Sequence, residues 1–354
     1  MSTLSQSPVV SPLGYASGVR SVFALEMKQR LRTRSWYVLL TVWFFVIGLV
    51  AMLTALNAGS QQGQRGPVLF ELMVGFVLFF GLLLAPALSA NGVNGDRAAG
   101  TLAILQVTLL RPGQILAGKW LAAWVASLGF LVASVPFLLW ALVLGGVRPL
   151  SALVAVVMLA VELGIVCAVG VGVSALAARP LFSIVVTYML VALLGLGTLI
   201  AFGLSTTLTE GTVRASPVQY SQSVPFDPEN YECVGEVQDM PALRTERVAW
   251  ILAANPFVIV ADAMPAQSGK PGVESGVMES ISILVREAQA GPESGMPCVN
   301  GEKKPGVTAG SLAVTPIWPL GLGIQLAVAA LLLFLGRRRL VTPVRNLSAG
   351  TRIA

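Results

Sequence analysis

Long apolar runs separated by short polar segments dominate the pattern along the chain. Six of these runs are long enough to cross a bilayer as a helix. They cover residues 36–56, 68–90, 120–146, 149–178, 181–205 and 311–336. The pattern therefore predicts an all-α polytopic membrane protein with six transmembrane helices.

A seventh apolar stretch, residues 247–264, is interrupted by Asn255-Pro256. Its uncharged core covers only residues 248–261, which is too short to cross a bilayer. We interpret the region near residues 242–264 as a re-entrant or interfacial helix.

The polar segments between the runs define the expected organisation. Residues 1–35 form the N-terminus with an amphipathic, basic helix, and residues 36–205 form spans one to five with a loop at 91–119. Residues 206–310 form an insertion that holds 13 of the 17 acidic residues, and residues 311–354 form span six and a basic tail. Within the insertion we expect helices at 242–264 and 278–290 and loops elsewhere, because the second stretch repeats apolar residues on one helical face.

The distribution of Lys and Arg predicts the orientation. The flanks on the side of the N-terminus hold fourteen of these residues, whereas the short loops on the other side hold only Arg65 and Arg148. Positive charge concentrates on the cytoplasmic side of membrane proteins. We therefore expect a multi-pass protein of the plasma membrane with both termini cytoplasmic, and an extracytoplasmic insertion.

Composition excludes several function classes. Hydrophobic residues make up 55% of the 354 residues and charged residues 11%, and the chain has no histidine. The lack of histidine argues against haem, histidine-ligated metal sites and histidine general bases. We expect no cofactor, no metal site, no catalytic residue and no nucleic-acid partner.

Two of the three cysteines, Cys233 and Cys298, lie in the expected outer insertion. An oxidising compartment allows a disulfide between them. The alternative is a pair of unpaired surface thiols. Cys167 lies inside the fourth apolar run, where a small packing residue is the simpler interpretation.

Residues 111–120, RPGQILAGKW, contain the GxxxxGK spacing of a phosphate-binding loop. That motif also needs a Ser or Thr after the lysine, to place a hydroxyl on magnesium, and a strand before the glycines. Trp120 occupies the hydroxyl position, and a long apolar run follows it. The motif therefore does not predict ATP binding by this chain.

The loop at 91–119 carries a more informative pattern. Asp96-Arg97 and Gly100-Thr101 precede the apolar stretch 102–110, which Arg111-Pro112 and then Gly118-Lys119 follow. The apolar stretch is too short to cross a membrane and too apolar to face water. Either the spans of this chain or a cytoplasmic partner covers it.

This order of residues resembles the type-2 ATP-binding-cassette (ABC) exporter permeases. In that family an acidic-Arg pair, Gly-Thr-Leu, a Leu-rich helix, a Pro-containing turn and Gly-Lys form the coupling element that docks on a separate cytoplasmic ATPase. The resemblance implies a coupling role for Asp96, Arg97, Gly100, Thr101, Leu102, Leu105, Leu109, Arg111, Pro112, Gly118 and Lys119.

The segment FALEMKQRLRTRSW before the first span resembles the interfacial helix of the same family. Glu26, Arg30, Arg32 and Arg34 are its charged residues. Basic side chains at this position would contact anionic lipid headgroups. The resemblance implies that the lipid bilayer, a cytoplasmic ABC ATPase and a second permease, identical or related, are the partners.

The sequence thus favours the transmembrane subunit of an ATP-driven exporter that is not itself an enzyme. The alternative is a secondary transporter or a membrane sensor with an extracytoplasmic domain. A secondary transporter is expected to show internal repeats and several intramembrane charges. This chain has one charged residue near the middle of a run, Glu162, which lines a substrate path or hydrogen-bonds to a neighbouring helix.

Overall fold

The computed structural model describes residues 14–57, 65–100, 110–220, 231–265, 276–294, 296–303 and 314–340. Six helices in this part of the chain are long and apolar enough to cross a membrane, which confirms an all-α polytopic membrane protein. They are α2 (Arg34–Asn57), α3 (Arg65–Ser89), α6 (Pro112–Val143), α7 (Pro149–Leu176), α8 (Pro180–Ala192) continued by α9 (Thr198–Thr206), and α12 (Trp318–Leu340).

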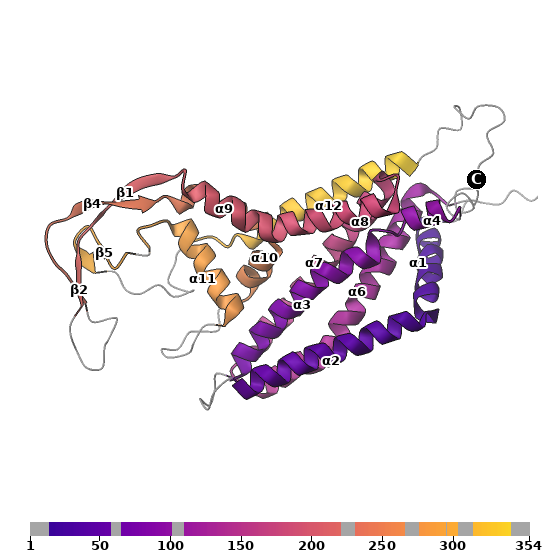
Figure 1. Cartoon of the computed structure of the whole chain (residues 1–354), viewed down its shortest axis with the longest axis horizontal. Coiled ribbons are helices and arrows are strands. Elements are labelled where there is room, and N and C mark those ends of the chain that lie inside the picture. The colour runs from indigo at the N-terminus through magenta and orange to yellow at the C-terminus, as the bar shows by residue number, and fades with distance from the viewer. Residues whose placement is uncertain are drawn as a thin grey trace, which may run out of the picture.

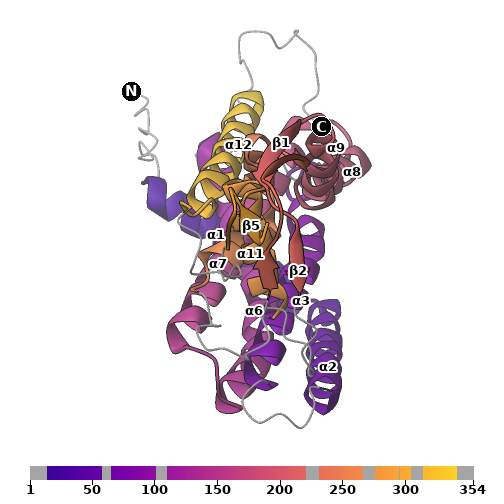
Figure 2. The same cartoon turned by 90° about the vertical axis from the view of Figure 1, so that its left-hand side faces the viewer.

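Helix α7 is the most buried of these spans, and α2 and α12 lie on opposite sides of the bundle (Figures 1 and 2). In the most apolar 18-residue stretch of α7, 61% is buried inside the protein, whereas in that of α2 only 17% is buried. Small residues allow neighbours to approach α7 closely. A Cβ at Gly172 would lie 2.8 Å from the Cβ of Leu332 on α12, and one at Gly164 would lie 3.0 Å from the indole nitrogen of Trp124 on α6.

Span five contains a π-helical turn, Leu193–Gly197, between α8 and α9. A π turn interrupts the regular hydrogen-bond ladder of a helix. Here the carbonyl of Gly195 accepts a hydrogen bond from Nδ2 of Asn255 at 2.7 Å, and the hydroxyl of Thr198 accepts one from the same nitrogen at 2.9 Å. The turn therefore joins span five to the insertion that follows it.

The N-terminal helix α1 (Tyr15–Arg32) lies across the ends of the spans rather than along them (Figure 1). It packs closely on the start of α6, because a Cβ at Gly118 would lie 2.6 Å from the Cβ of Val22. The expected loop at 91–119 is partly helical. It contains α4 (Asn94–Ala98) and the first turns of α6, which begins at Pro112 rather than at 120.

The insertion contains strands where the sequence analysis expected loops, so that expectation was wrong. The strands are β1 (Glu210–Ala215), β2 (Val218–Tyr220), β3 (Tyr231–Cys233), β4 (Gln238–Leu243), β5 (Cys298–Val299) and β6 (Glu302–Lys303). One sheet has the order β4-β1-β5-β6, and β2 pairs with β3 in a second sheet; all pairs are antiparallel. A disulfide between Cys233 and Cys298 links the two sheets.

The helical part of the insertion also differs from the expectation near residues 242–264. Residues 242 and 243 belong to β4, and two 3₁₀ turns (Thr245–Arg247 and Ala249–Ala254) precede α10 (Pro256–Ala263). Asn255 caps α10, since its side chain accepts a hydrogen bond from the backbone N–H of Phe257 at 2.9 Å, and Pro256 occupies the first helical position. The second expected helix is confirmed as α11 (Val277–Ala290).

Helix α12 begins at Trp318, later than the predicted start at 311. The prediction followed the apolar composition and ignored Pro316. The helical conformation is disfavoured for the residue before a proline, so a helix is not expected to run through residue 315. The fully buried carboxylate of Asp262 caps this helix. It accepts hydrogen bonds from the backbone N–H groups of Ile317 at 2.7 Å and Trp318 at 3.2 Å, and it pairs with Arg286 of α11 at 2.9 Å.

A second buried carboxylate joins α11 to span two. Glu71 of α3 is 1% exposed, and its Oε2 accepts a hydrogen bond from the backbone N–H of Glu279 at 3.0 Å. A negative charge is favourable at this end of a helix. Gly276 leaves room for this carboxyl, because a Cβ there would lie 2.2 Å from the same oxygen. Carboxylates therefore fix the insertion to spans two and six.

Candidate functional site

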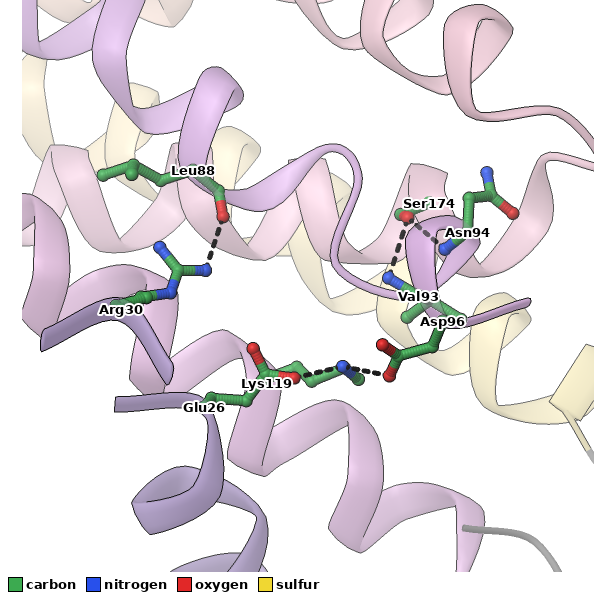
Figure 3. Close-up of polar contacts among 8 residues, drawn as sticks. All are labelled: Glu26, Arg30, Leu88, Val93, Asn94, Asp96, Lys119 and Ser174. Carbon is green, nitrogen blue, oxygen red and sulfur yellow. Dashed lines mark hydrogen bonds and ion pairs between the residues drawn. The ribbon is translucent and has the colours of Figure 1, made fainter. Parts of the chain in front are cut away.

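A buried cation lies between two carboxylates at the end of the bundle that carries α1 and α4 (Figure 3). Lys119 of α6 is 2% exposed, and its Nζ forms ion pairs with Glu26 of α1 and, at 2.6 Å, with Asp96 of α4. These three residues, the Lys119 cluster, come from three elements. Loss of one partner from such a cluster leaves an uncompensated charge, so the ion pairs hold the three elements in one arrangement.

The chain on the α4 side of the cluster is fixed to α7. The hydroxyl of Ser174 accepts hydrogen bonds from the backbone N–H groups of Val93 and Asn94, both at 3.1 Å (Figure 3). Arg97 donates to the carbonyl of Ala177 at 2.7 Å, just after the end of α7. Gly100 then takes a φ of 72°, a conformation that favours glycine. Residues 91–100 are therefore attached to span four as well as to Lys119.

The chain that enters α6 is fixed to α1. Oε1 of Gln114 accepts a hydrogen bond from the backbone N–H of Arg111 at 2.7 Å, and Nε2 donates to the carbonyls of Gly14 and Tyr15, both at 3.3 Å. Pro112 occupies the first position of α6, where its missing N–H costs nothing. Segment 101–109 thus connects two attached ends, one held by α4 and α7 and the other by α1 and α6.

The arginines of the expected interfacial helix divide into two kinds. Arg30 is partly buried and donates to the carbonyl of Leu88 at the end of α3, at 2.8 Å (Figure 3). Its burial lowers the pKa of the guanidinium, and the nearby Glu26 carboxylate opposes that shift; an arginine nevertheless stays charged in proteins. Arg32 and Arg34 are exposed. Helix α1 therefore contacts span two as well as α6.

The structure brings together Glu26, Asp96 and Lys119 and places Arg97, Arg111, Pro112 and Gly118 next to them along the same elements. Thr101, Leu102, Leu105 and Leu109 lie outside the described residues. Glu162 is in α7 and is fully buried, and Cys233 and Cys298 form the disulfide at the opposite, strand-bearing end.

The GxxxxGK spacing lies on a helix. Gly113, Gly118 and Lys119 all belong to α6, and the lysine is neutralised by two carboxylates. A phosphate cradle needs a glycine-rich loop and a free lysine. These residues therefore have a structural role in place of the phosphate-binding one.

Gln114 and Ser174 were not among the predicted site residues, although they hold the chain on either side of segment 101–109. Gln114 sits three residues after Arg111, the spacing of a residue that returns to cap the start of a helix. That spacing is a usable signal. Ser174 lies in an apolar run and gives no signal in the local sequence, because its partners are about eighty positions away along the chain.

The family model described as ABC-2 family transporter protein matches residues 20–266 of the chain. The match includes most of α1, the Lys119 cluster, spans one to five and the insertion up to the end of α10. No curated protein matches the chain.

Proposed function

Because the chain belongs to the ABC-2 family of transporter proteins and is the permease subunit of an ABC transporter, we propose that it exports a substrate with energy from ATP hydrolysed on a separate cytoplasmic subunit. The observation that supports this most strongly is the Lys119 cluster, because two of its members, Asp96 and Lys119, flank the apolar segment 101–109 along the chain. Segment 101–109 is the proposed docking surface, and the cluster is the proposed link to the spans.

Movement of segment 101–109 would reach four elements. The end at Gly100 is connected to α6 through Asp96 and Lys119, and to α7 through Arg97. The end at Arg111 is connected to α1 through Gln114. Closing of the ATPase would therefore shift α1, α4, α6 and α7 together, which is the kind of rigid-body change that alternates a transporter between two states.

The proposed orientation places α1, α4 and the end of α12 in the cytoplasm of a cell with this protein in its plasma membrane. Arg337, Arg338 and Arg339 form the last turn of α12, on the same end as the exposed Arg32 and Arg34. Lysine and arginine concentrate on the cytoplasmic side. The strand-bearing insertion is then extracytoplasmic, where its disulfide is stable.

We also propose that two permeases assemble around the substrate path. Only 22% of the most apolar stretch of α8–α9, 22% of that of α12 and 17% of that of α2 is buried inside the protein. These three of the six spans therefore leave most of their surface to lipid or to a second copy. A single bundle with a closely packed α7 at its centre offers no polar path among the described residues.

Leu105→Asp tests the docking role. A charge introduced into a buried apolar contact is unfavourable unless it finds a partner. We expect the variant to insert and fold normally but to lose the ATPase during co-purification and to lose ATP-dependent transport. Leu284→Asp is the matched control, because Leu284 is 63% exposed on α11, far from α4 along the molecule (Figure 1).

Two outcomes would contradict the docking role. Normal co-purification with full transport would show that the ATPase binds elsewhere. Failure of the variant to insert or fold, with a normal Leu284→Asp control, would show that segment 101–109 packs on the spans of this chain.

A further inference from the structure

Glu162 lies halfway along α7, is fully buried, and takes no part in the Lys119 cluster. Within the described residues, neither of its carboxyl oxygens has a hydrogen-bond partner. A buried polar group of this kind needs an explanation, because nearly all buried acceptors in folded proteins are paired.

Gln325 of α12 is near enough to interact with this carboxyl, although neither carboxyl oxygen has a hydrogen-bond partner in the described residues. The Gln325 side chain is itself buried, and its Nε2 donates to the carbonyl of Ala254 at 3.0 Å. That contact fixes the orientation of the amide, since only the nitrogen can donate to a carbonyl. Oε1 of Gln325 is then left buried and also lacks a partner in the described part of the chain.

These three buried acceptor oxygens belong to α7 and α12, two helices that pack against each other and that Figure 1 shows side by side. No charged side chain of the helices packed on α7 pairs with Glu162 in the described structure. At the end with α1 and α4 the charged residues are Lys119 of α6 and Arg337, Arg338 and Arg339 of α12. At the strand-bearing end they are Glu71 of α3 and Asp262 of α10. Tyr188 of α8 donates to the carbonyl of Leu83, and the free thiol Cys167 of α7 faces Ser127.

A proton on Glu162 would change this balance. The carboxylic acid has one O–H donor, whereas the carboxylate accepts only. An ionised, unpaired carboxylate is unfavourable in the membrane interior, so the neutral form fits a closed, dry contact. Its O–H can donate to Oε1 of Gln325 and satisfy two of the three unpartnered acceptors.

We propose that Glu162 is a proton-binding site that closes the contact between α7 and α12. With the proton bound, Glu162 donates to Gln325, whose Nε2 holds the carbonyl of Ala254 in the insertion. When the contact opens and water enters, the carboxyl releases the proton to water and remains as a solvated carboxylate. The state of the proton then depends on the state of the transporter, because each state favours one form.

This site is separate from the proposed ATPase docking surface and does not depend on it. The route from Glu162 through Gln325 to Ala254 ends next to Asn255, which binds the π turn of span five. Proton binding would thus stabilise the packing of spans four, five and six together with the insertion.

Infrared spectroscopy of the full chain in lipid nanodiscs tests the proposal. The wild type should show the carbonyl stretch of neutral carboxylic acid at neutral pH, and Glu162→Gln should lose the Glu162 component of that absorption. Glu71→Gln should retain this component, because Glu71 is a separate buried carboxyl, whose Oε2 accepts a hydrogen bond from the backbone N–H of Glu279. If the Glu162→Gln spectrum keeps all of the neutral-acid absorption that the wild type shows, the proposal is wrong.

Thermal unfolding against pH provides a second measurement. The wild type should lose melting temperature as the pH rises, since a proton bound only in the folded state stabilises it, whereas Glu162→Gln should be much less affected. A melting temperature that instead rises with sodium or potassium at constant pH, and only in chains with Glu162, would assign the site to a metal cation and contradict the proposal.

If Glu162→Gln does not fold, the wild type alone decides the question. A hydrophobic carbodiimide reacts with neutral carboxylic acids and adds to the carboxyl oxygen. Mass spectrometry should find the adduct on Glu162, with less of it at higher pH. No adduct at any pH would show that Glu162 does not carry a proton in the closed state.

Discussion

Two ends of the helix bundle are held together by different kinds of polar contact. At the end with α1 and α4, side chains pair with side chains around Lys119, and the carboxylates of Glu26 and Asp96 remain 13% and 27% exposed. At the strand-bearing end, Glu71 and Asp262 accept hydrogen bonds from the backbone at the starts of α11 and α12. Partly exposed ion pairs can rearrange when a partner binds, whereas buried helix caps fix their elements in place.

The largest effect is expected from Asp262→Ala at the strand-bearing end. The variant loses two backbone hydrogen bonds and leaves Arg286 without its buried partner. Removal of one member of a buried charge pair costs about 3–5 kcal/mol. Thermal unfolding in nanodiscs should show a marked fall in melting temperature, with no such fall for the exposed control Glu236→Ala. Equal melting temperatures for Asp262→Ala and wild type would show that Asp262 does not hold α10, α11 and α12 together.

The disulfide should affect the insertion alone. Cys233 and Cys298 are 65 positions apart, and a link of this length stabilises the connected region by about 2–4 kcal/mol. Reductant, or Cys233→Ser with Cys298→Ser, should speed proteolysis of the insertion and leave the spans protected. The double variant is its own control, since reductant should not change it further. If the insertion resists protease equally with and without the disulfide, the disulfide does not stabilise it.

Much of the bundle follows from local sequence, and the joints between its parts do not. The apolar runs predict α2 and α7 within a few residues, because apolar length alone decides a span. The Lys119 cluster joins residues 93 positions apart, and β1 pairs Ala215 with Val299 of β5. Contacts of this kind depend on how the spans pack, and no local pattern specifies them.

Some signals were present and were misread. Asn255-Pro256 marks the start of α10, as a capping residue followed by a proline at the first helical position, and not only an interruption of an apolar run. Pro316 likewise indicates that span six begins after it. The two-residue strands β5 and β6 gave no signal, because so short an alternation of residues cannot be separated from a loop.

At the other end of the bundle, Lys119→Met should cost less than Asp262→Ala. The variant leaves Glu26 and Asp96 without their cation, but both carboxylates can turn toward water. We therefore expect the free energy of unfolding to fall by about 2 kcal/mol. Lys119→Arg, which keeps the charge, is the control in the same unfolding measurement. A loss as large as that of Asp262→Ala would mean that the two ends do not differ in the way described.

Gly118→Ala should have the smallest effect of the series. Its Cβ would lie 2.6 Å from the Cβ of Val22 and 3.0 Å from the carbonyl oxygen of Val19, so α1 must move away from α6 at a cost of about 1–2 kcal/mol. Gly113→Ala is the matched control on the same helix, because its nearest atom would be 3.4 Å away. If both variants unfold at the same temperature, the close contact between α1 and α6 does not stabilise the protein.

We propose that ATP hydrolysis acts on the spans through the Lys119 cluster and not through the strand-bearing end. The most direct test is the rate of ATP hydrolysis per assembled complex in nanodiscs, measured below the unfolding temperature of every variant. We expect the Lys119→Met complex to retain the ATPase but to hydrolyse ATP several-fold more slowly, and the Asp262→Asn complex to hydrolyse it at the wild-type rate. An unchanged rate for Lys119→Met, or a reduced rate for Asp262→Asn, would show that the Lys119 cluster is not the link between the ATPase and the spans.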